Sequence, residues 1–304
     1  MADGRLPFPA ALSDQAQEGA QPEPDGIGDE QMPEAREHSP DAAGVPADWD
    51  ARPGSAWRGI LFGLPVLLYF LVGTAIVGLA ALLRPNLFRR RGHAWIRLLG
   101  AVPLKILGVR VETNGLTWRD LPGPKIVLFN HVSLLDLLTV ASVCPQNLVV
   151  IYKQELGRIP GLGWGLRGTG MIPVDRSDHD RALQSMQHAH RRLEDRRETL
   201  LMAPEGTRSR AGGLQRFKLG AFHMAATMKI PIIALVQRGV PEILPMGSFL
   251  VRSGRVRIDF LPPVDTSTWS VETVREHADE VRQLYLKYLE PAPPRTPRRP
   301  PNGL

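Results

Sequence analysis

A long apolar run in the first third of the chain limits the fold most strongly. The run 59–83, GILFGLPVLLYFLVGTAIVGLAALL, contains 25 residues without a charge. As a helix it would be about 37 Å long, which is enough to cross the hydrocarbon core of a bilayer. Two arginines precede the run and five follow it closely: Arg52 and Arg58, then Arg84, Arg89, Arg90, Arg91 and Arg97. Because positive charge favours the cytoplasmic side, we expect a membrane protein whose C-terminal body lies in the cytoplasm.

A hairpin that enters and leaves one leaflet is the alternative to a spanning helix. The run is interrupted by one proline and three glycines: Pro65, Gly63, Gly73 and Gly78. Such residues are compatible with a kinked, re-entrant segment. The next stretch, 93–109, mixes Trp95 and basic residues with apolar ones, which predicts an interfacial helix, although it could instead pack on the body. We therefore predict a membrane-embedded unit over residues 57–108.

The two ends of the chain have a different composition. Residues 1–50 contain twelve acidic residues against Arg5 and Arg36, a balance of −10. The whole chain carries +6, so the remainder carries +16. The leader has few large apolar residues and cannot bury enough surface to offset the entropy of ordering. We expect disorder over 1–56 and over the Pro/Arg-rich tail 291–304, which leaves 109–290 for one catalytic domain of ordinary size.

Charge and cysteine content exclude several classes of function. The arginines of the basic body are dispersed and show no recognisable nucleic-acid motif, so a membrane surface or phosphate groups explain the charge more simply. Cys144 is the single cysteine, which excludes an intramolecular disulfide and a cysteine-only metal cluster. It lies in the apolar stretch LLTVASVCP, where we expect a buried thiol and not a nucleophile.

Beyond Val109 the chain alternates short β-rich runs with helical patterns. The predicted strands are 109–113, 125–130, 147–152, 171–174, 199–203, 231–237 and 255–261, and the predicted helices are 133–142, 181–197, 218–229 and 271–289. This alternation is typical of a layered α/β domain with a mostly parallel or mixed sheet flanked by helices. The polar motifs all follow strands, where open α/β sheets usually bind their ligands.

The motif NHVSLLD holds a candidate acid–base pair. KIVLFN predicts a buried strand that ends at Asn130, and Ser133 with Asp136 has the spacing of a capping box, so a helix should start near Ser133. His131 would lie just outside the helix and Asp136 in its first turn, close enough to hold one ring nitrogen. A neutral imidazole there suits a general base, with Asp136 fixing its tautomer. A structural histidine at a helix start is the alternative.

No nucleophilic serine or metal site accompanies this pair. The chain contains no GxSxG elbow and no second histidine at a recognisable metal-site spacing. We therefore expect the base to activate a substrate hydroxyl or water.

A second motif, TLLMAPEGTRS, places polar residues after a buried strand. They are Glu205, Gly206, Thr207 and Arg208. Arg208 can grip a phosphate through two N–H groups, and Gly206 lets the backbone come close. Glu205 can accept hydrogen bonds from a polyol or hold the arginine in place. A Glu–Arg ion pair in a turn is the alternative.

Two more cations follow strands. MIPVDR places Arg176 just past a strand with Asp175 beside it, and IYKQEL contains Lys153. Both cations can contact a phosphate. A surface ion pair for Arg176 and a solvated side chain for Lys153 are the alternatives.

Four ordered blocks together resemble the 1-acylglycerol-3-phosphate acyltransferase family, also called lysophosphatidate acyltransferases. NHVSLLD matches the block NHxSxxD, and GMIPVDR, EGTRS and KIPIIALV match the second, third and fourth blocks. The resemblance covers roughly Leu104 to Val264. The chain departs from the pattern at Ala234, where many members have a second proline, but it retains Pro231.

The resemblance implies acyl transfer to the sn-2 hydroxyl of a lysophosphatidate at a membrane, with acyl-CoA or acyl carrier protein as donor and no metal or other cofactor. It implies that His131 is the catalytic base and that Asp136 is its partner. The residues expected to bind the substrate are Arg176, Glu205, Gly206, Thr207, Arg208 and Lys153. The region around Pro231 is expected to shape the acyl-donor site.

Three rival interpretations stay open. The acceptor could be a lyso-ornithine lipid, a lysophospholipid with a larger headgroup, or glycerol 3-phosphate. The chain could be a lipid hydrolase in which His131 activates water, which would release free fatty acid without an acceptor. It could also be a scaffold without catalysis, which would consume no thioester.

Overall fold

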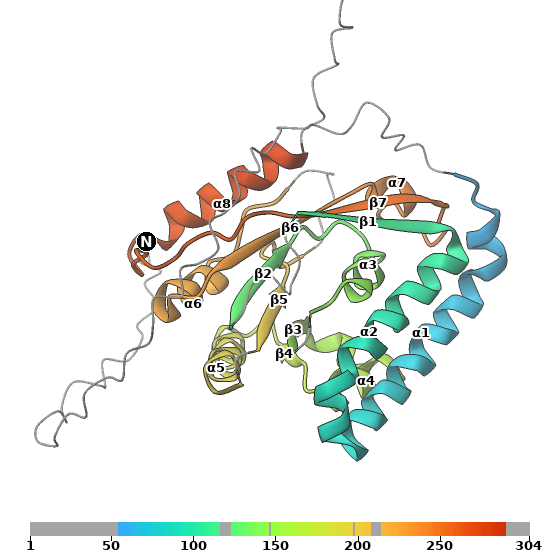
Figure 1. Ribbon diagram of the computed structural model, residues 1–304, viewed down its shortest axis with the longest axis horizontal. Helices are drawn as coiled ribbons and strands as arrows, with labels where there is room; N and C mark the ends of the chain where they lie inside the picture. The colour runs from blue at the N-terminus through green and yellow to red at the C-terminus, as the bar shows by residue number, and fades with distance from the viewer. Residues whose placement is uncertain (1–53, 116–122, 146, 197, 208–213, 290–304) are drawn as a thin grey trace, which may run out of the picture. The chain divides into compact units, whose positions relative to one another are not determined.

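The computed structural model describes residues 54–115, 123–145, 147–196, 198–207 and 214–289 (Figure 1). The predicted tail, and the predicted leader apart from its last three residues, lie outside these ranges. The described chain begins with two long helices, α1 (Trp57–Leu83) and α2 (Pro85–Leu107), and continues into an α/β domain.

Seven strands in the described residues form one mixed sheet. They are β1 (Val109–Gly115), β2 (Lys125–Phe129), β3 (Leu148–Lys153), β4 (Ile172–Val174), β5 (Thr199–Met202), β6 (Ile232–Arg238) and β7 (Gly254–Phe260). Their order across the sheet is β1-β7-β6-β2-β5-β3-β4. The block from β6 to β4 is parallel, whereas β7 is antiparallel to β6 and parallel to β1. The seven predicted strands and the mixed sheet are confirmed.

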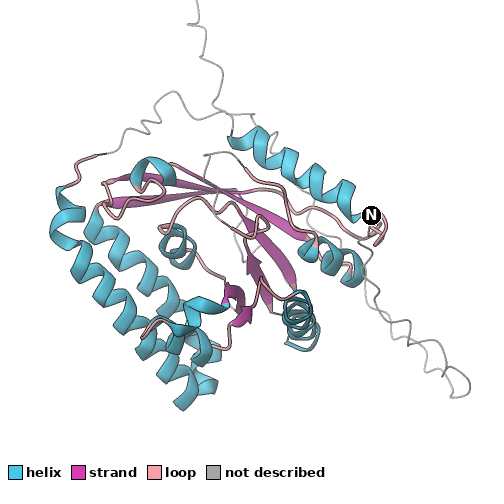
Figure 2. Ribbon diagram, turned by 180° about the vertical axis from the view of Figure 1, so that it is seen from behind, coloured by secondary structure: helices cyan, strands magenta, loops and turns pink. Residues whose placement is uncertain are grey.

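Helices cover both faces of this sheet (Figure 2). They are α3 (Asp136–Ser142), α4 (Leu162–Gly168), α5 (His179–Arg196), α6 (Gly220–Met228), α7 (Val240–Ile243) and α8 (Val274–Leu289), with a 3₁₀ turn, η2 (Gln154–Arg158). Ile126 and Leu128 of β2 pack with α5, α6 and α8, whereas Val127 packs with α1, α2 and α3. Because strand side chains alternate between faces, a strand covered on both sides is apolar throughout. This explains the unbroken apolar run IVLF that follows Lys125 in β2.

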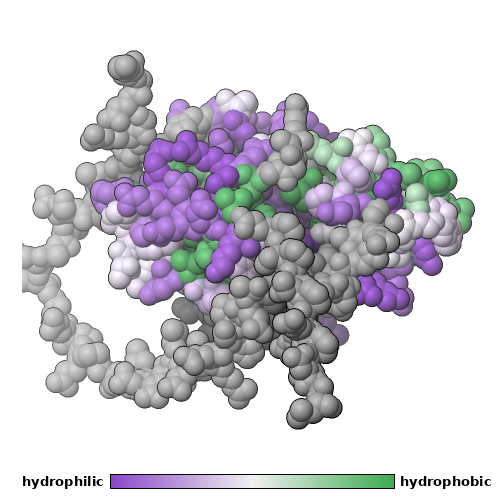
Figure 3. All heavy atoms as spheres, turned by 90° about the horizontal axis from the view of Figure 1, so that it is seen from above, coloured by the Kyte–Doolittle hydropathy of each residue, from purple (hydrophilic) through white to green (hydrophobic). Residues whose placement is uncertain are grey.

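The helix α1 exposes one apolar face along its whole length. It is continuous through Pro65, and it is long and apolar enough to cross a membrane. Its exposed large side chains recur every three or four residues, the period of one helix face. They are Trp57, Ile60, Leu61, Leu64, Leu67, Leu68, Val72, Ile76, Leu79, Leu82 and Leu83. In Figure 3 hydrophobic residues gather at the right, the side on which α1 lies in Figure 1.

The other face of α1 packs against the domain from one end to the other. Near its start, Gly59 lies against the backbone of Val251. Near its end, a Cβ on Gly78 would lie 2.6 Å from the Cα of Gly165, so this contact requires glycine. The same close approach explains why α4 is helical, although its sequence, LGWGLRG, is too rich in glycine to predict a helix. Thus α1 lies along the domain and does not project from it.

Three details differ from the sequence-based expectations or refine them. The helix α3 begins at Asp136 and not near Ser133, because the Ser133 hydroxyl bonds instead to the backbone of Leu244 and Leu135. The predicted interfacial helix begins earlier, at Pro85, and packs on α1 and α3. Cys144 is buried, as expected, and burial raises the pKa of its thiol to about 11.

Candidate active site

The candidate base lies where the central strand β2 ends. His131 follows Phe129, the last residue of β2, after one intervening residue. Its Nδ1 lies 2.7 Å from Oδ2 of Asp136, the first residue of α3. The His131 side chain is 23% exposed, whereas that of Asp136 is fully buried. The predicted loop-to-helix contact is therefore confirmed, and it leaves Nε2 as the ring nitrogen available for proton transfer.

A single carboxylate oxygen organises this turn. In addition to the imidazole, Oδ2 of Asp136 accepts the backbone N–H groups of Val132 at 2.8 Å and Ser133 at 2.9 Å. Oδ1 is buried and has no hydrogen-bond partner among the described residues. Because three donors converge on one oxygen, the turn from His131 to Asp136 has little freedom to change shape.

A network of polar side chains next to the base continues the contact between β2 and β6 beyond the last strand pairing. The sequence motifs predicted no role for it. Asn130 is 1% exposed, and its side chain donates to the carbonyl of Gln237 at 2.9 Å and accepts its N–H at 2.7 Å. The Gln237 side chain in turn accepts the hydroxyl of Thr139 at 2.6 Å, on α3. In the sequence, Asn130 is visible only as a motif position and Thr139 only as a residue of a predicted helix. The network fixes α3 against β6.

Glu205 is buried next to the backbone of His131 and is not exposed at the surface of the site. The residue is 1% exposed, and each of its oxygens accepts a backbone N–H: Oε1 that of His131 and Oε2 that of Gln215, both at 2.9 Å. Burial raises the pKa of this carboxyl, while the two N–H groups act in the opposite direction. Both oxygens of Glu205 therefore bond to the backbone of the protein, and the residue offers almost no surface to a polyol.

Arg176 and Gly206 meet across two motifs. The guanidinium of Arg176, just past β4, donates to the carbonyl of Gly206. Gly206 has φ +72°, a conformation that favours glycine. Arg176 is exposed, and partial desolvation lowers its pKa, with Glu155 acting in the opposite direction. Thr207 is exposed beside them, and Arg208 lies outside the described residues.

The neighbouring charges form ion pairs of their own. Lys153 lies 3.0 Å from Glu155, and both side chains are about half exposed. Asp175 does not pair with Arg176. It accepts the Ser177 hydroxyl at 2.6 Å and lies 3.4 Å from Arg181. These bonds, with that from Ser177 first, lower the pKa of Asp175 to about 2.

Pro231 lies at the opposite end of the sheet from His131. Its carbonyl accepts the N–H of Ile126, near the start of β2. β2 and β6 are parallel, so the five residues from Ile126 to His131 separate Pro231 from the base by roughly 16 Å. The structure therefore does not bring Pro231 to the predicted site.

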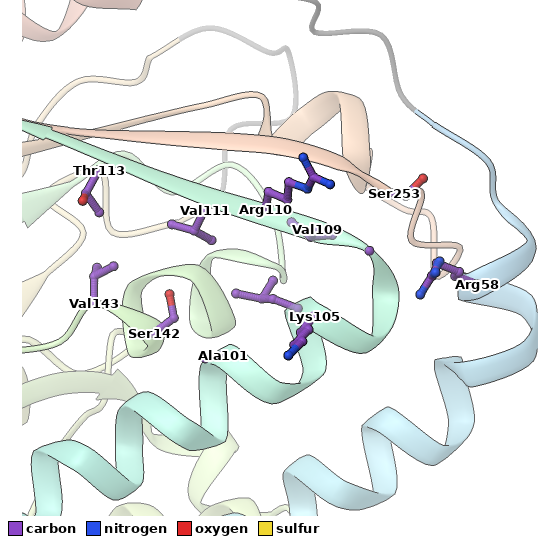
Figure 4. Close-up of a pocket in the computed structure, with 12 residues that line it drawn as sticks. Arg58, Ala101, Lys105, Val109, Arg110, Val111, Thr113, Ser142, Val143 and Ser253 are labelled. Carbon is purple, nitrogen blue, oxygen red and sulfur yellow. The ribbon is translucent and has the colours of Figure 1, made fainter.

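A cavity of about 740 Å³ lies apart from these residues (Figure 4). It is lined by Lys105 of α2, by Val109 and Val111 of β1, and by Val143 after α3. None of the predicted site residues lines it.

Comparisons with known proteins agree with this chemistry. Residues 110–238 match the family model described as Acyltransferase. The 1-acyl-sn-glycerol-3-phosphate acyltransferase of Escherichia coli K12 is 32% identical over 193 residues, which are 64% of this chain and 76% of that protein. The enzyme of the same name from Limnanthes douglasii is 29% identical over 224 residues, 74% of this chain and 79% of that protein.

A solved structure supports the fold. The crystal structure of the 1-acyl-sn-glycerophosphate acyltransferase from Thermotoga maritima covers 73% of this chain and 94% of its own, with a TM-score of 0.60 and 24% identity. Together with the ordered sequence blocks, these matches show that the chain belongs to the 1-acyl-sn-glycerol-3-phosphate acyltransferase family and is an O-acyltransferase.

Proposed function

We propose that this protein transfers a fatty acyl group from a thioester, acyl-CoA or acyl carrier protein, to the sn-2 hydroxyl of 1-acyl-sn-glycerol 3-phosphate. The product would be phosphatidate, and the reaction would take place at a membrane surface. The observation that carries the proposal is the 2.7 Å contact between His131 and Asp136, because it orients a base beside the segment where Arg176 meets Gly206.

In the proposed reaction, His131 acts as general base and then as general acid. Nδ1–H donates to Asp136, so the Nε2 lone pair takes the proton of the acceptor hydroxyl. The oxygen attacks the thioester carbonyl and forms a tetrahedral intermediate. When this intermediate collapses, the C–S bond breaks and the thiolate takes the proton from the imidazolium. The buried Asp136 carboxylate stabilises the imidazolium while it exists.

In the same proposal, the phosphate of the acceptor lies against Arg176. A guanidinium has five N–H donors, and among the described residues Arg176 uses one of them in a bond to Gly206, so donors remain for an anion. Arg208, Thr207 and Lys153 are proposed as further contacts. Because Lys153 is paired with Glu155, its contribution would require that ion pair to open.

We further propose that one face of α1 enters a leaflet of the membrane. The exposed face of α1 is apolar, whereas its other face contacts the domain from Gly59 to Gly78. If α1 crossed the bilayer, it would carry those parts of the domain into hydrocarbon. The excess of arginines that follows α1 still favours a cytoplasmic location for the domain. Leu64→Asp with Ile76→Asp should abolish co-sedimentation with phospholipid vesicles, and undiminished binding would contradict this arrangement.

An acceptor panel tests the proposed function. Purified protein in detergent is given an acyl-CoA with one acceptor at a time: 1-acylglycerol 3-phosphate, lysophosphatidylcholine, lyso-ornithine lipid, glycerol 3-phosphate, or none. We expect the highest kcat/KM with 1-acylglycerol 3-phosphate. A higher kcat/KM with another acceptor would overturn the assignment of the acceptor. Release of free fatty acid at the same rate without any acceptor would favour a hydrolase.

A further inference from the structure

Glu205 is an acidic residue in the protein interior, where charged residues are rarely found. It begins the EGTRS segment, three residues after β5 ends, and is 1% exposed. A buried carboxylate is costly unless its oxygens are hydrogen bonded. Here each oxygen accepts one backbone N–H at 2.9 Å. Because main-chain donors are fixed by the fold, this carboxylate is fully committed to the protein itself.

One of the two donors is the amide of the base. The ladder between β2 and its neighbours ends at Leu128 on the β5 side and at Phe129 on the β6 side. The N–H of His131 therefore lies beyond the last strand pairing, and Glu205 supplies its acceptor. The backbone of His131 is held by Glu205 and its ring is held by Asp136. Two separate carboxylates thus fix the position of one imidazole.

The other donor connects the base to a second anchored segment. Oε2 of Glu205 accepts the N–H of Gln215. The Arg282 side chain of α8 donates to the carbonyl of Gln215 at 3.0 Å and to that of Leu214 at 2.8 Å. Hence the segment at 214–215 has two independent anchors, and only Glu205 also touches His131. This difference makes Arg282 a matched control.

We propose that Glu205 is a positioning residue that holds the backbone of the catalytic base, and that it does not contact the acyl acceptor. The proposal rests on the proposed role of His131. A carboxylate that bound the acceptor would need an exposed oxygen, which Glu205 lacks. A positioning residue is expected to change kcat and not KM, since it acts on the geometry of the reacting groups.

The test compares Glu205→Gln and Glu205→Ala with Arg282→Gln and His131→Ala. The variants are assayed over a range of lysophosphatidate concentrations, and kcat is calculated per folded molecule from thermal unfolding of the same samples. We expect kcat to fall about 100-fold in Glu205→Ala, the order of loss associated with a 1 Å misplacement of reacting groups. Glu205→Gln keeps the volume but turns one acceptor into a donor, so it should lose about 10-fold. KM should stay within about 3-fold in both variants.

The control variants separate the outcomes. Arg282→Gln should keep kcat within about 3-fold, because it loosens 214–215 without touching His131. A KM increase with unchanged kcat in the Glu205 variants would overturn the proposal in favour of acceptor binding. Equal losses of kcat in Glu205→Gln and Arg282→Gln would overturn it in favour of a general effect of the segment. If His131→Ala keeps its activity, the proposed function itself fails.

Discussion

The site has a base half, His131 with Asp136, and an anion half, Arg176 with Gly206, and the two are built in different ways. In the base half, the side chain of Asp136 is fully buried and its Oδ2 accepts three donors within 2.9 Å. In the anion half, Arg176 is exposed, and its one hydrogen bond among the described residues is to the carbonyl of Gly206. One half is fixed by the fold, whereas the other is open to solvent.

This difference is consistent with the task proposed for each half. A general base must be placed within hydrogen-bond reach of one proton, so its turn benefits from several fixed contacts. A phosphate clamp works through charge-assisted bonds of an exposed guanidinium, which can close on the anion when it arrives. We therefore expect substitutions in the base half to lower kcat and substitutions in the anion half to raise KM.

The largest effect is expected for His131→Ala. Removal of the base should lower kcat by about 10³-fold, within the range usual for general base catalysis. The protein should remain folded, because the His131 side chain is 23% exposed and the backbone contacts of its turn are kept. Initial rates and a thermal unfolding curve check both points. A kcat within about 10-fold of the wild type would contradict the assignment of His131 as the general base.

Asp136→Asn should lower kcat almost as much, by about 10²- to 10³-fold. The amide can still accept backbone N–H groups, but an NH₂ group facing Nδ1 would favour the tautomer with the proton on Nε2. The base would then lack its lone pair on the substrate side. Measurement of KM in the same assay supplies the control. A raised KM with normal kcat would place Asp136 in the anion half instead.

Arg176→Ala should raise the KM for lysophosphatidate by about 10- to 100-fold, the loss expected for a hydrogen bond to a charged group. The kcat at saturation should stay within about 3-fold of the wild type. Arg191→Ala, an exposed arginine on α5, is the matched control for the loss of one positive charge. An equal effect of both substitutions would mean that net charge, and not a specific contact, binds the acceptor.

The smallest effect concerns Asp175, which supports the turn that carries Arg176. Its pKa is lowered from 3.8 to about 2, first by the Ser177 hydroxyl. A lowered pKa in the folded state stabilises the protein above the ordinary value and loses that effect as the pH falls toward 2. Asp175→Asn should therefore make the denaturant midpoint less dependent on pH between 4 and 2. An unchanged acid dependence would show that the turn does not need this charge.

Much of the fold could be predicted because its signals are local. The strands are short apolar runs, and His131 and Asp136 lie only five residues apart across a predicted helix start. The helix α4 could not be predicted, since glycines disfavour a helix until α1 packs against them. The burial of Glu205 depends on the N–H of Gln215, ten residues later, which no local pattern reveals.

Pro231 shows what a match to a sequence block leaves undetermined. The motif containing it is matched as a block, but a block does not say at which end of a strand each residue lies. Pro231 precedes β6, and the parallel pairing of β6 with β2 places it beside the start of β2 and away from His131. The direction of the strands, and not the motif, determines which residues meet.

The central claim is that a base and a phosphate clamp act on one acceptor. The most direct test measures kcat/KM for lysophosphatidate relative to monoacylglycerol, its analogue without phosphate, in the wild type, His131→Ala and Arg176→Ala. We predict that His131→Ala lowers both values in proportion, while Arg176→Ala lowers only the value for lysophosphatidate. An Arg176→Ala variant that keeps the full preference for lysophosphatidate, or a His131→Ala variant that keeps its rate with either acceptor, would contradict the account.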